Sequence, residues 1–199
     1  MPRLLLTAFE PYGPFPTNAS LLCLAAMGEI RRPGWEIVQR IYPVDFEAVR
    51  TMLADDLAAD YDVVFLSGQA PGSAVIRLES MGWNEGIRPG SHAGESFLLE
   101  EMGQAVYEST LPLESWAETL RQAGLPAALS KDGGRYLCNA SLYWTLHHAA
   151  TRGLKTQALF VHLPLEPSQT TEHPSLAAAE SARAMHLLLD AATSRAFSD

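Results

Sequence analysis

The sequence predicts an α/β fold with a mostly parallel central sheet and helices on both of its faces. Short apolar runs alternate along the chain with segments of helical periodicity, which is the pattern of such folds. At 199 residues and 47% hydrophobic content, the chain is long enough to bury a full core. No repeat or linker divides it, so one domain is expected over residues 1–199.

The expected strands are short apolar runs bounded by turn residues. The run at 63–67 is apolar almost throughout, which indicates burial on both faces, and the run at 74–80 follows the turn GQAPG at 68–72. Six strands are predicted, at residues 4–9, 37–44, 63–67, 74–80, 127–130 and 158–163.

Helical periodicity fills the intervals between these strands. Asp45 is expected to cap one helix at its N-terminus, and Gly124 and Gly153 are expected to end two others. Five helices are predicted, at residues 18–27, 45–59, 113–123, 138–151 and 175–192. Residues 81–111 show no stable period and are rich in Gly, Ser and polar residues, so a long surface excursion is expected there.

Charge and hydropathy limit the expected partners. Fourteen Lys and Arg against 23 Asp and Glu give a formal net charge of −9, which repels phosphate backbones and anionic lipids. Nucleic acid and membranes are therefore not expected as partners. No apolar stretch has the length of a membrane span or of a signal-peptide core, so a cytoplasmic location is expected.

Several apparent motifs do not indicate a ligand site. GQAPG lacks a following Lys-Ser or Lys-Thr, and TAFEPYGPF at 7–15 has too few glycines for a dinucleotide turn. His147 and His148 are neighbours that point about 100° apart on a helix, so packing or surface roles are predicted for both and no metal site is expected. The two cysteines, Cys23 and Cys138, form no CxxC pair, which excludes a zinc ribbon or disulfide framework.

The two cysteines differ in their surroundings. Cys23 lies in the apolar segment SLLCLAAM and is predicted to be a core residue. Cys138 follows Gly133 and Gly134 and precedes a helical pattern, so its sulfur is expected at a helix start, where unpaired N–H groups and the helix dipole stabilise a thiolate. Cys138 is therefore a candidate nucleophile, and the alternative is a small buried hydrophobic residue.

A cysteine nucleophile needs a base, and His162 is the best candidate. It closes the apolar run of LFVHLPL, and the sites of parallel α/β sheets gather at the carboxyl ends of strands. The alternative for His162 is a hydrogen-bonded core histidine. Glu79 in AVIRLES is the candidate to orient the imidazole, since a carboxylate within a strand indicates a partner, although an exposed strand face is an alternative explanation.

Four segments together resemble the type I pyroglutamyl peptidases, a family of cysteine peptidases also called pyrrolidone-carboxylate peptidases. The segments are FEPYG at 9–13, GQAPGSAVIRLE at 68–79, YLCN at 136–139 and FVHLPLEP at 160–167, with STLPL and LHHA as further matches. The resemblance implies a three-layer α/β fold of the phosphorylase/hydrolase-like type, no cofactor, and a tendency to form homo-oligomers. It also implies removal of N-terminal 5-oxoproline from peptides.

The resemblance also implies roles for individual residues. Cys138 would be the nucleophile, His162 the general base and then acid, and Glu79 the residue that orients His162. The lactam ring of the substrate would lie against Phe9 and Tyr12. Asn18 and Gln69 would face the polar edge of the ring, and the alternatives are a helix N-cap role for Asn18 and a turn position for Gln69. The oxyanion would contact the backbone N–H of Cys138 and Arg88.

The chain departs from the family pattern around the expected ring pocket. Ala8 and Pro14 stand where glycines are usual, Tyr12 stands where phenylalanine is usual, and residues 88–94 replace an Arg-Ile-Pro-Asp-Asn-x-Gly run. Two alternatives to a pyroglutamyl peptidase therefore stay open. They are a cysteine amidase or lactam hydrolase with another acyl preference, and a binding protein without catalytic activity.

Overall fold

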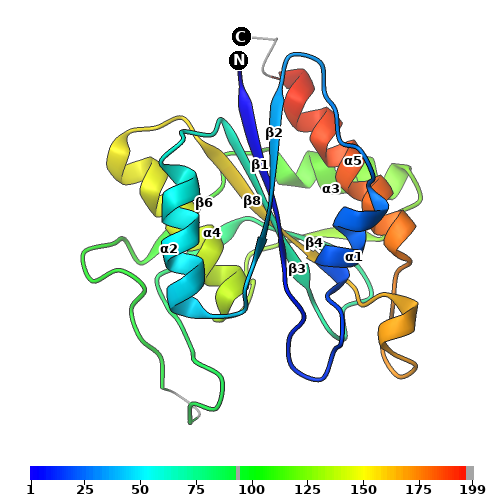
Figure 1. The fold of residues 1–199 in the computed structure, drawn as a ribbon, viewed down its shortest axis with the longest axis horizontal. Coiled ribbons are helices and arrows are strands. Elements are labelled where there is room, and N and C mark those ends of the chain that lie inside the picture. The colour runs from blue at the N-terminus through cyan, green and yellow to red at the C-terminus, as the bar shows by residue number, and fades with distance from the viewer. Residues whose placement is uncertain (93–94, 196–199) are drawn as a thin grey trace.

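A computed structural model describes residues 1–92 and 95–195 of the chain. A six-stranded central sheet lies between two layers of helices (Figure 1). A second sheet of two short strands packs against one of these layers. The three-layer α/β prediction is confirmed.

The central sheet has the strand order β2-β1-β3-β8-β4-β7. Its strands are β1 (Arg3–Phe9), β2 (Glu36–Tyr42), β3 (Val63–Gln69), β4 (Ile76–Glu79), β7 (Ala127–Ser130) and β8 (Gln157–Leu163). Each of the predicted strands is present with small shifts at its ends. One shift matters for the site, because β3 continues to Gln69, which was expected in a turn.

The sheet is mostly but not wholly parallel. β1, β2, β3 and β8 run parallel, whereas β4 is antiparallel to β8 and parallel to β7. This reversal pairs Arg77 of β4 with His162 of β8. Because alternate side chains of a strand share a face, Arg77 and Glu79 project on the same side of β4.

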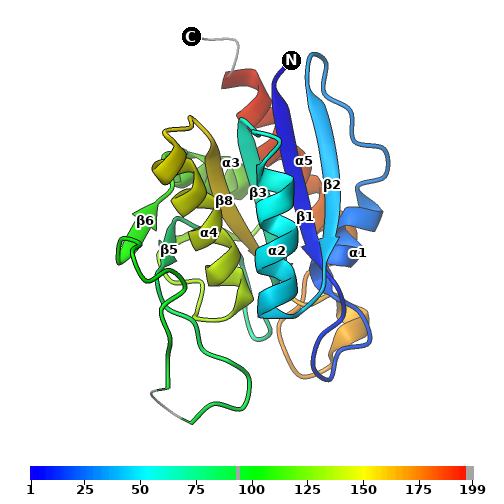
Figure 2. The ribbon, with the colours of Figure 1, turned by 60° about the vertical axis from the view of Figure 1, so that its left-hand side comes forward.

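Helices cover both faces of the sheet, as Figure 2 shows. One face carries α1 (Ala19–Ala26), α3 (Leu113–Gln122) and α5 (Ala178–Arg195), and the other carries α2 (Phe46–Leu57) and α4 (Leu137–Arg152). Asp45 caps α2 by accepting a hydrogen bond from Ala48 N–H at 2.9 Å, and Gly153 ends α4 with φ 64°. α5 lies three residues later than predicted, and the 3₁₀ helix η1 (Pro167–Gln169) was not predicted. In the described ranges, no helix is long and apolar enough to cross a bilayer.

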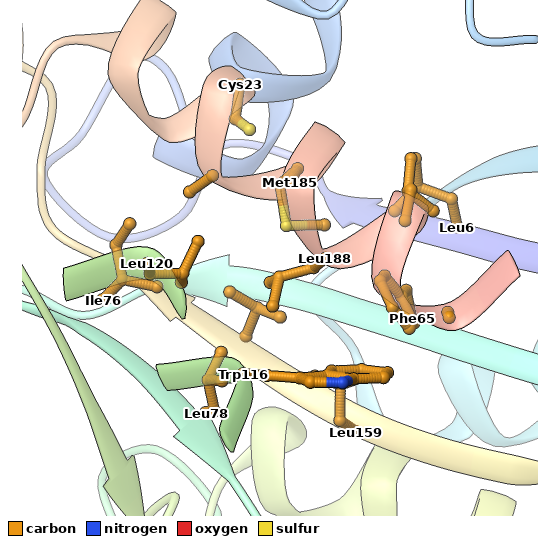
Figure 3. Packing of buried hydrophobic residues seen from close by; sticks show 14 of the residues in the cluster. Leu6, Cys23, Phe65, Ile76, Leu78, Trp116, Leu120, Leu159, Met185 and Leu188 are labelled. Atoms are coloured by element: carbon orange, nitrogen blue, oxygen red, sulfur yellow. The ribbon is translucent and has the colours of Figure 1, made fainter. Parts of the chain in front are cut away.

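Two clusters of buried apolar side chains join the layers. In the larger one, Trp116 of α3 and Met185 of α5 pack towards Phe65 and Leu159 of the sheet (Figure 3). Cys23 belongs to this cluster and is 2% exposed, so its predicted core position is confirmed. The second cluster packs α2 and α4 against the opposite face.

The segment at 81–111 is only in part the surface excursion that was predicted. Two short strands, β5 (Met81–Trp83) and β6 (Val106–Glu108), pair antiparallel within it and pack against α4. Gly82 permits this approach, because a Cβ at that position would lie 2.6 Å from Cα of Tyr143. Asn84 and Leu111 are buried as well, so the two ends of the segment belong to the packed body of the protein.

Candidate active site

His162 and Glu79 form a buried pair across β8 and β4. Nδ1 of His162 lies 2.8 Å from Oε1 of Glu79, and the two residues are 4% and 1% exposed. A buried carboxylate needs a partner, and the imidazole supplies it. The exposed-face explanation of Glu79 is therefore wrong. Because Nδ1 faces the carboxylate, Nε2 is the ring nitrogen left for proton exchange.

The charges around the pair favour an imidazolium. Burial by itself lowers the pKa of His162, but the negative charge of Cys138, a hydrogen bond with it, and Glu79 raise that pKa to about 9. Burial by itself raises the pKa of Glu79, but the hydrogen bond and charge of His162, helped by Arg77, hold it below its usual value. At neutral pH, these two pKa shifts favour a protonated His162 beside an ionised Glu79.

Cys138 is the second residue of α4, so the expected position at a helix start is confirmed. The first N–H groups of a helix have no acceptor within it, and with the helix dipole they favour negative charge nearby. Gly68 of β3 lets the strand lie close to the thiol, since a Cβ there would lie 3.3 Å from Sγ of Cys138. The side chain of Cys138 is partly exposed, unlike that of Cys23.

A cavity of about 160 Å³ opens beside Cys138, where β1 and β3 end. Most of its walls are apolar, with a few polar groups, which is typical of sites for small ligands. It is lined by Phe9, Tyr12, Pro14, Phe15, Asn18, Val44, Gly68, Gln69, Pro71, Tyr136, Leu137 and Cys138. All four residues expected to contact the substrate thus share one cavity with the candidate nucleophile.

The two predicted ring contacts differ in exposure. Phe9 is 3% exposed, whereas Tyr12 is 41% exposed and its ring lies 5.5 Å from that of Tyr136, measured between centroids. Tyr12 therefore belongs to the open side of the cavity and Phe9 to its buried side.

The two predicted polar contacts also differ. The amide of Asn18 is engaged locally: its Oδ1 accepts from Ser20 N–H at 3.1 Å and its Nδ2 donates to the Glu10 carbonyl at 3.0 Å. Oε1 of Gln69 accepts from Ala19 N–H at 3.1 Å. Among the described residues, none accepts a hydrogen bond from Nε2 of Gln69, so this donor is available to a ligand.

Arg88 lies away from the cavity, contrary to its expected oxyanion role. Its guanidinium pairs with Glu47 at 3.2 Å and covers the rings of Phe46 and Phe97, with CZ-to-centroid distances of 5.5 and 4.9 Å. Cation–π contacts and an ion pair thus hold it at the N-terminal end of α2. Residues 93 and 94, the end of the divergent stretch 88–94, lie outside the described residues.

Three residues near the site were not singled out from the sequence. Tyr136 lines the cavity next to the start of α4. Asn139 is buried and ties α4 to β5, because its side chain accepts from Trp83 N–H and donates to the Trp83 carbonyl. Arg77 lies beside His162 and Glu79. A strand period of two would have placed Arg77 on the face of Glu79.

The neighbouring histidines of α4 have packing roles, as predicted. Nδ1 of His147 lies 3.1 Å from the hydroxyl of Tyr107, and its ring stacks on that of Tyr143. Burial lowers the pKa of His148. In the part of the chain that the structure describes, no three His, Cys, Asp or Glu residues are grouped as metal ligands would be.

The different surroundings of the two thiols lead to a labelling prediction. Iodoacetamide near neutral pH should modify Cys138 faster than Cys23 by on the order of a hundredfold or more, because only a thiolate reacts. Burial raises the pKa of the Cys23 thiol to about 12, while Cys138 lines an open cavity. Peptide mapping after brief labelling measures both rates. Equal labelling, or faster labelling of Cys23, would contradict an activated Cys138.

Comparison with known proteins identifies relatives along most of the chain. The sequence profile of the pyroglutamyl peptidase family matches residues 2–195. A pyrrolidone-carboxylate peptidase of Thermococcus onnurineus is 33% identical over 182 residues, which cover 86% of this chain and 88% of the relative. Another, from Yersinia pestis, is 32% identical over 200 residues, covering 98% of this chain and 92% of the relative.

Solved structures agree with this assignment. The pyrrolidone carboxyl peptidase of Fervidobacterium islandicum superposes with a TM-score of 0.90 at 28% identity, covering 98% of this chain and 99% of that one. The enzyme of Thermococcus litoralis gives a TM-score of 0.88 at 26% identity, covering 96% and 92%. The chain belongs to the pyroglutamyl peptidase family.

Proposed function

We propose that this protein is a cysteine exopeptidase that removes N-terminal pyroglutamate from peptides. The observation that carries the proposal is the small, mostly apolar cavity beside Cys138, with the buried His162–Glu79 pair nearby. A neutral five-membered lactam fits such walls without the cost of burying a charge. The family match and relatives with this activity in their names support the same reaction.

The first half of the proposed reaction forms an acyl-enzyme. His162 Nε2 takes the proton of the Cys138 thiol, and Sγ attacks the carbonyl carbon of the pyroglutamyl residue. The tetrahedral oxyanion accepts a hydrogen bond from the backbone N–H of Cys138. The C–N bond then breaks as the imidazolium gives its proton to the leaving amine, which leaves a thioester.

The second half regenerates the enzyme. Water attacks the thioester carbonyl and gives its proton to His162, and the C–S bond breaks to release pyroglutamate. Glu79 holds the imidazole in the orientation that points Nε2 at the reacting atoms, without touching the substrate. The ring rests on Phe9 and Tyr12, and the free Nε2 of Gln69 donates to the lactam carbonyl.

Similarity to this family also supports proposals for the partners, the oligomeric state and the location of the protein. The partners are peptides with N-terminal pyroglutamate, and the protein forms a homo-oligomer, either a dimer or a tetramer. A cytoplasmic location suits an enzyme that needs a reduced thiol, and both cysteines are free.

The proposal is tested by the release of a fluorogenic amine from its pyroglutamyl amide. The expected result is turnover that is lost after alkylation of Cys138. A folded protein that binds the amide without turnover would instead be a binding protein. Turnover of other small acyl amides, with none of the pyroglutamyl amide, would indicate an amidase of different specificity.

A further inference from the structure

Arg77 places a second cation against the carboxylate that faces His162. Its Nε lies 3.2 Å from Oε1 of Glu79, the same oxygen that faces the imidazole. Its Nη2 lies 3.4 Å from Nδ1 of His162. The antiparallel pairing of β4 with β8 sets this contact, because Arg77 and His162 are partners in the register.

The contact between Arg77 and His162 cannot be an ordinary hydrogen bond while Nδ1 donates to Glu79. A guanidinium only donates, and Nδ1 of an imidazolium also only donates. The two groups therefore compete for one carboxylate oxygen and repel each other when both are charged. The side chain of Arg77 is 35% exposed, so water weakens this repulsion without removing it.

The charged groups around His162 determine how strongly its imidazolium form is stabilised. Cys138 of α4 and Glu79 of β4 attract the imidazolium, and Arg77 of β4 is the cation that opposes them. Gly68 of β3 is paired in register with His162, and Gly133 lies near its Cε1, but neither carries a charge. Once Sγ of Cys138 is bonded to the substrate carbon it is no longer an anion, and Glu79 without Arg77 would still hold the imidazolium proton tightly, which suits a base but hinders donation to an amine.

We propose that Arg77 is a positioning residue that shares the Glu79 carboxylate with His162 and so weakens the hold of the imidazole on its proton. It touches neither substrate nor nucleophile and acts through Glu79 and His162. The consequence rests on the proposed function: Arg77 helps the imidazolium Nε2–H pass its proton to the leaving amine as the C–N bond breaks.

The direct test is an NMR titration of ¹³C-labelled histidine Cε1, assigned to His162 with a His162→Asn variant. Removing the cation in Arg77→Gln should raise the midpoint of His162 by about one pH unit, because a like charge no longer opposes protonation. Arg77→Thr is a second neutral variant, whose β-branched side chain suits a strand. Arg77→Lys should stay close to the wild-type midpoint.

A matched control separates this local effect from the loss of one positive charge. Arg183 of α5 donates to the Ala123 carbonyl at 2.8 Å on the opposite face of the sheet. Arg183→Gln changes the net charge equally and should leave the midpoint unmoved. An unchanged or lowered midpoint in folded Arg77→Gln and Arg77→Thr would overturn the proposal, and so would an Arg77→Lys midpoint that matches the neutral variants.

Kinetics supply the second readout. In Arg77→Gln, the pH at which kcat/KM is lost on the alkaline side should rise together with the NMR midpoint. The kcat for a pyroglutamyl amide should fall about tenfold, whereas the kcat for an activated pyroglutamyl ester should change little. Equal losses for amide and ester would contradict a role in proton donation. The titration needs no turnover, so a protein inactive on pyroglutamyl substrates would refute the proposed function and still test Arg77.

Discussion

Replacing Cys138 by serine, or His162 by alanine, is expected to lower kcat on a pyroglutamyl amide by on the order of a thousandfold or more. Cys138 supplies the nucleophile and His162 the proton transfers, and among the described residues that line the cavity Cys138 carries the only thiol. Because the two act as one unit, the double variant should be little worse than either single variant. Steady-state kinetics on folded proteins measures all three.

Glu79 and Cys23 provide the comparisons for this series. Glu79→Gln should cost less than either replacement, because an amide oxygen can still accept the Nδ1 hydrogen bond and Glu79 makes no bond to substrate. Cys23→Ala removes the other thiol, which lies in the core among α1 and α5, and should keep kcat near the wild-type value. A His162→Ala protein with near-normal kcat would show that another group is the base.

The placement of the reacting groups could be predicted because it follows from local rules. Cys138 was expected at a helix start and His162 at a strand end, and both expectations need only the glycine pair, the helical pattern and the apolar run. The carboxyl ends of parallel strands and the start of the following helix meet at one edge of such a sheet. Phe9 and Gln69 end β1 and β3 at that same edge.

What the sequence did not reveal depends on long-range packing. The direction of β4 is not encoded by alternation, since a strand buries the same residues whichever way it runs. β5 and β6 have three residues each, too few to establish a period. Arg88 was expected at the oxyanion, but the ring of Phe46, from a distant part of the chain, and that of Phe97 hold it elsewhere.

The cavity should discriminate strongly among N-terminal residues that differ little in size. An N-terminal glutamine carries an ammonium, and none of the described residues that line the cavity carries a carboxylate. Burying that ion against Phe9 costs several kcal/mol when it is unpaired. Glutaminyl amides are therefore expected to have a kcat/KM lower than that of the pyroglutamyl amide by at least roughly a thousandfold.

Proline is the complementary probe, because it keeps the five-membered ring but lacks the lactam carbonyl and has a basic amine. The free Nε2 of Gln69 would then face no acceptor, and sites built to hydrogen-bond a missing group discriminate by about four orders of magnitude. The measurement compares kcat/KM for pyroglutamyl, glutaminyl and prolyl amides of one fluorogenic amine.

Gln69→Leu serves as the control, because it removes the side-chain donor. It should reduce the difference in kcat/KM between the pyroglutamyl and prolyl amides and leave kcat/KM for the glutaminyl amide low. If wild-type protein cleaves the prolyl or glutaminyl amide as well as the pyroglutamyl amide, the cavity selects on ring size or apolar contact, and the changes at Ala8, Tyr12 and Pro14 have made a broader amidase.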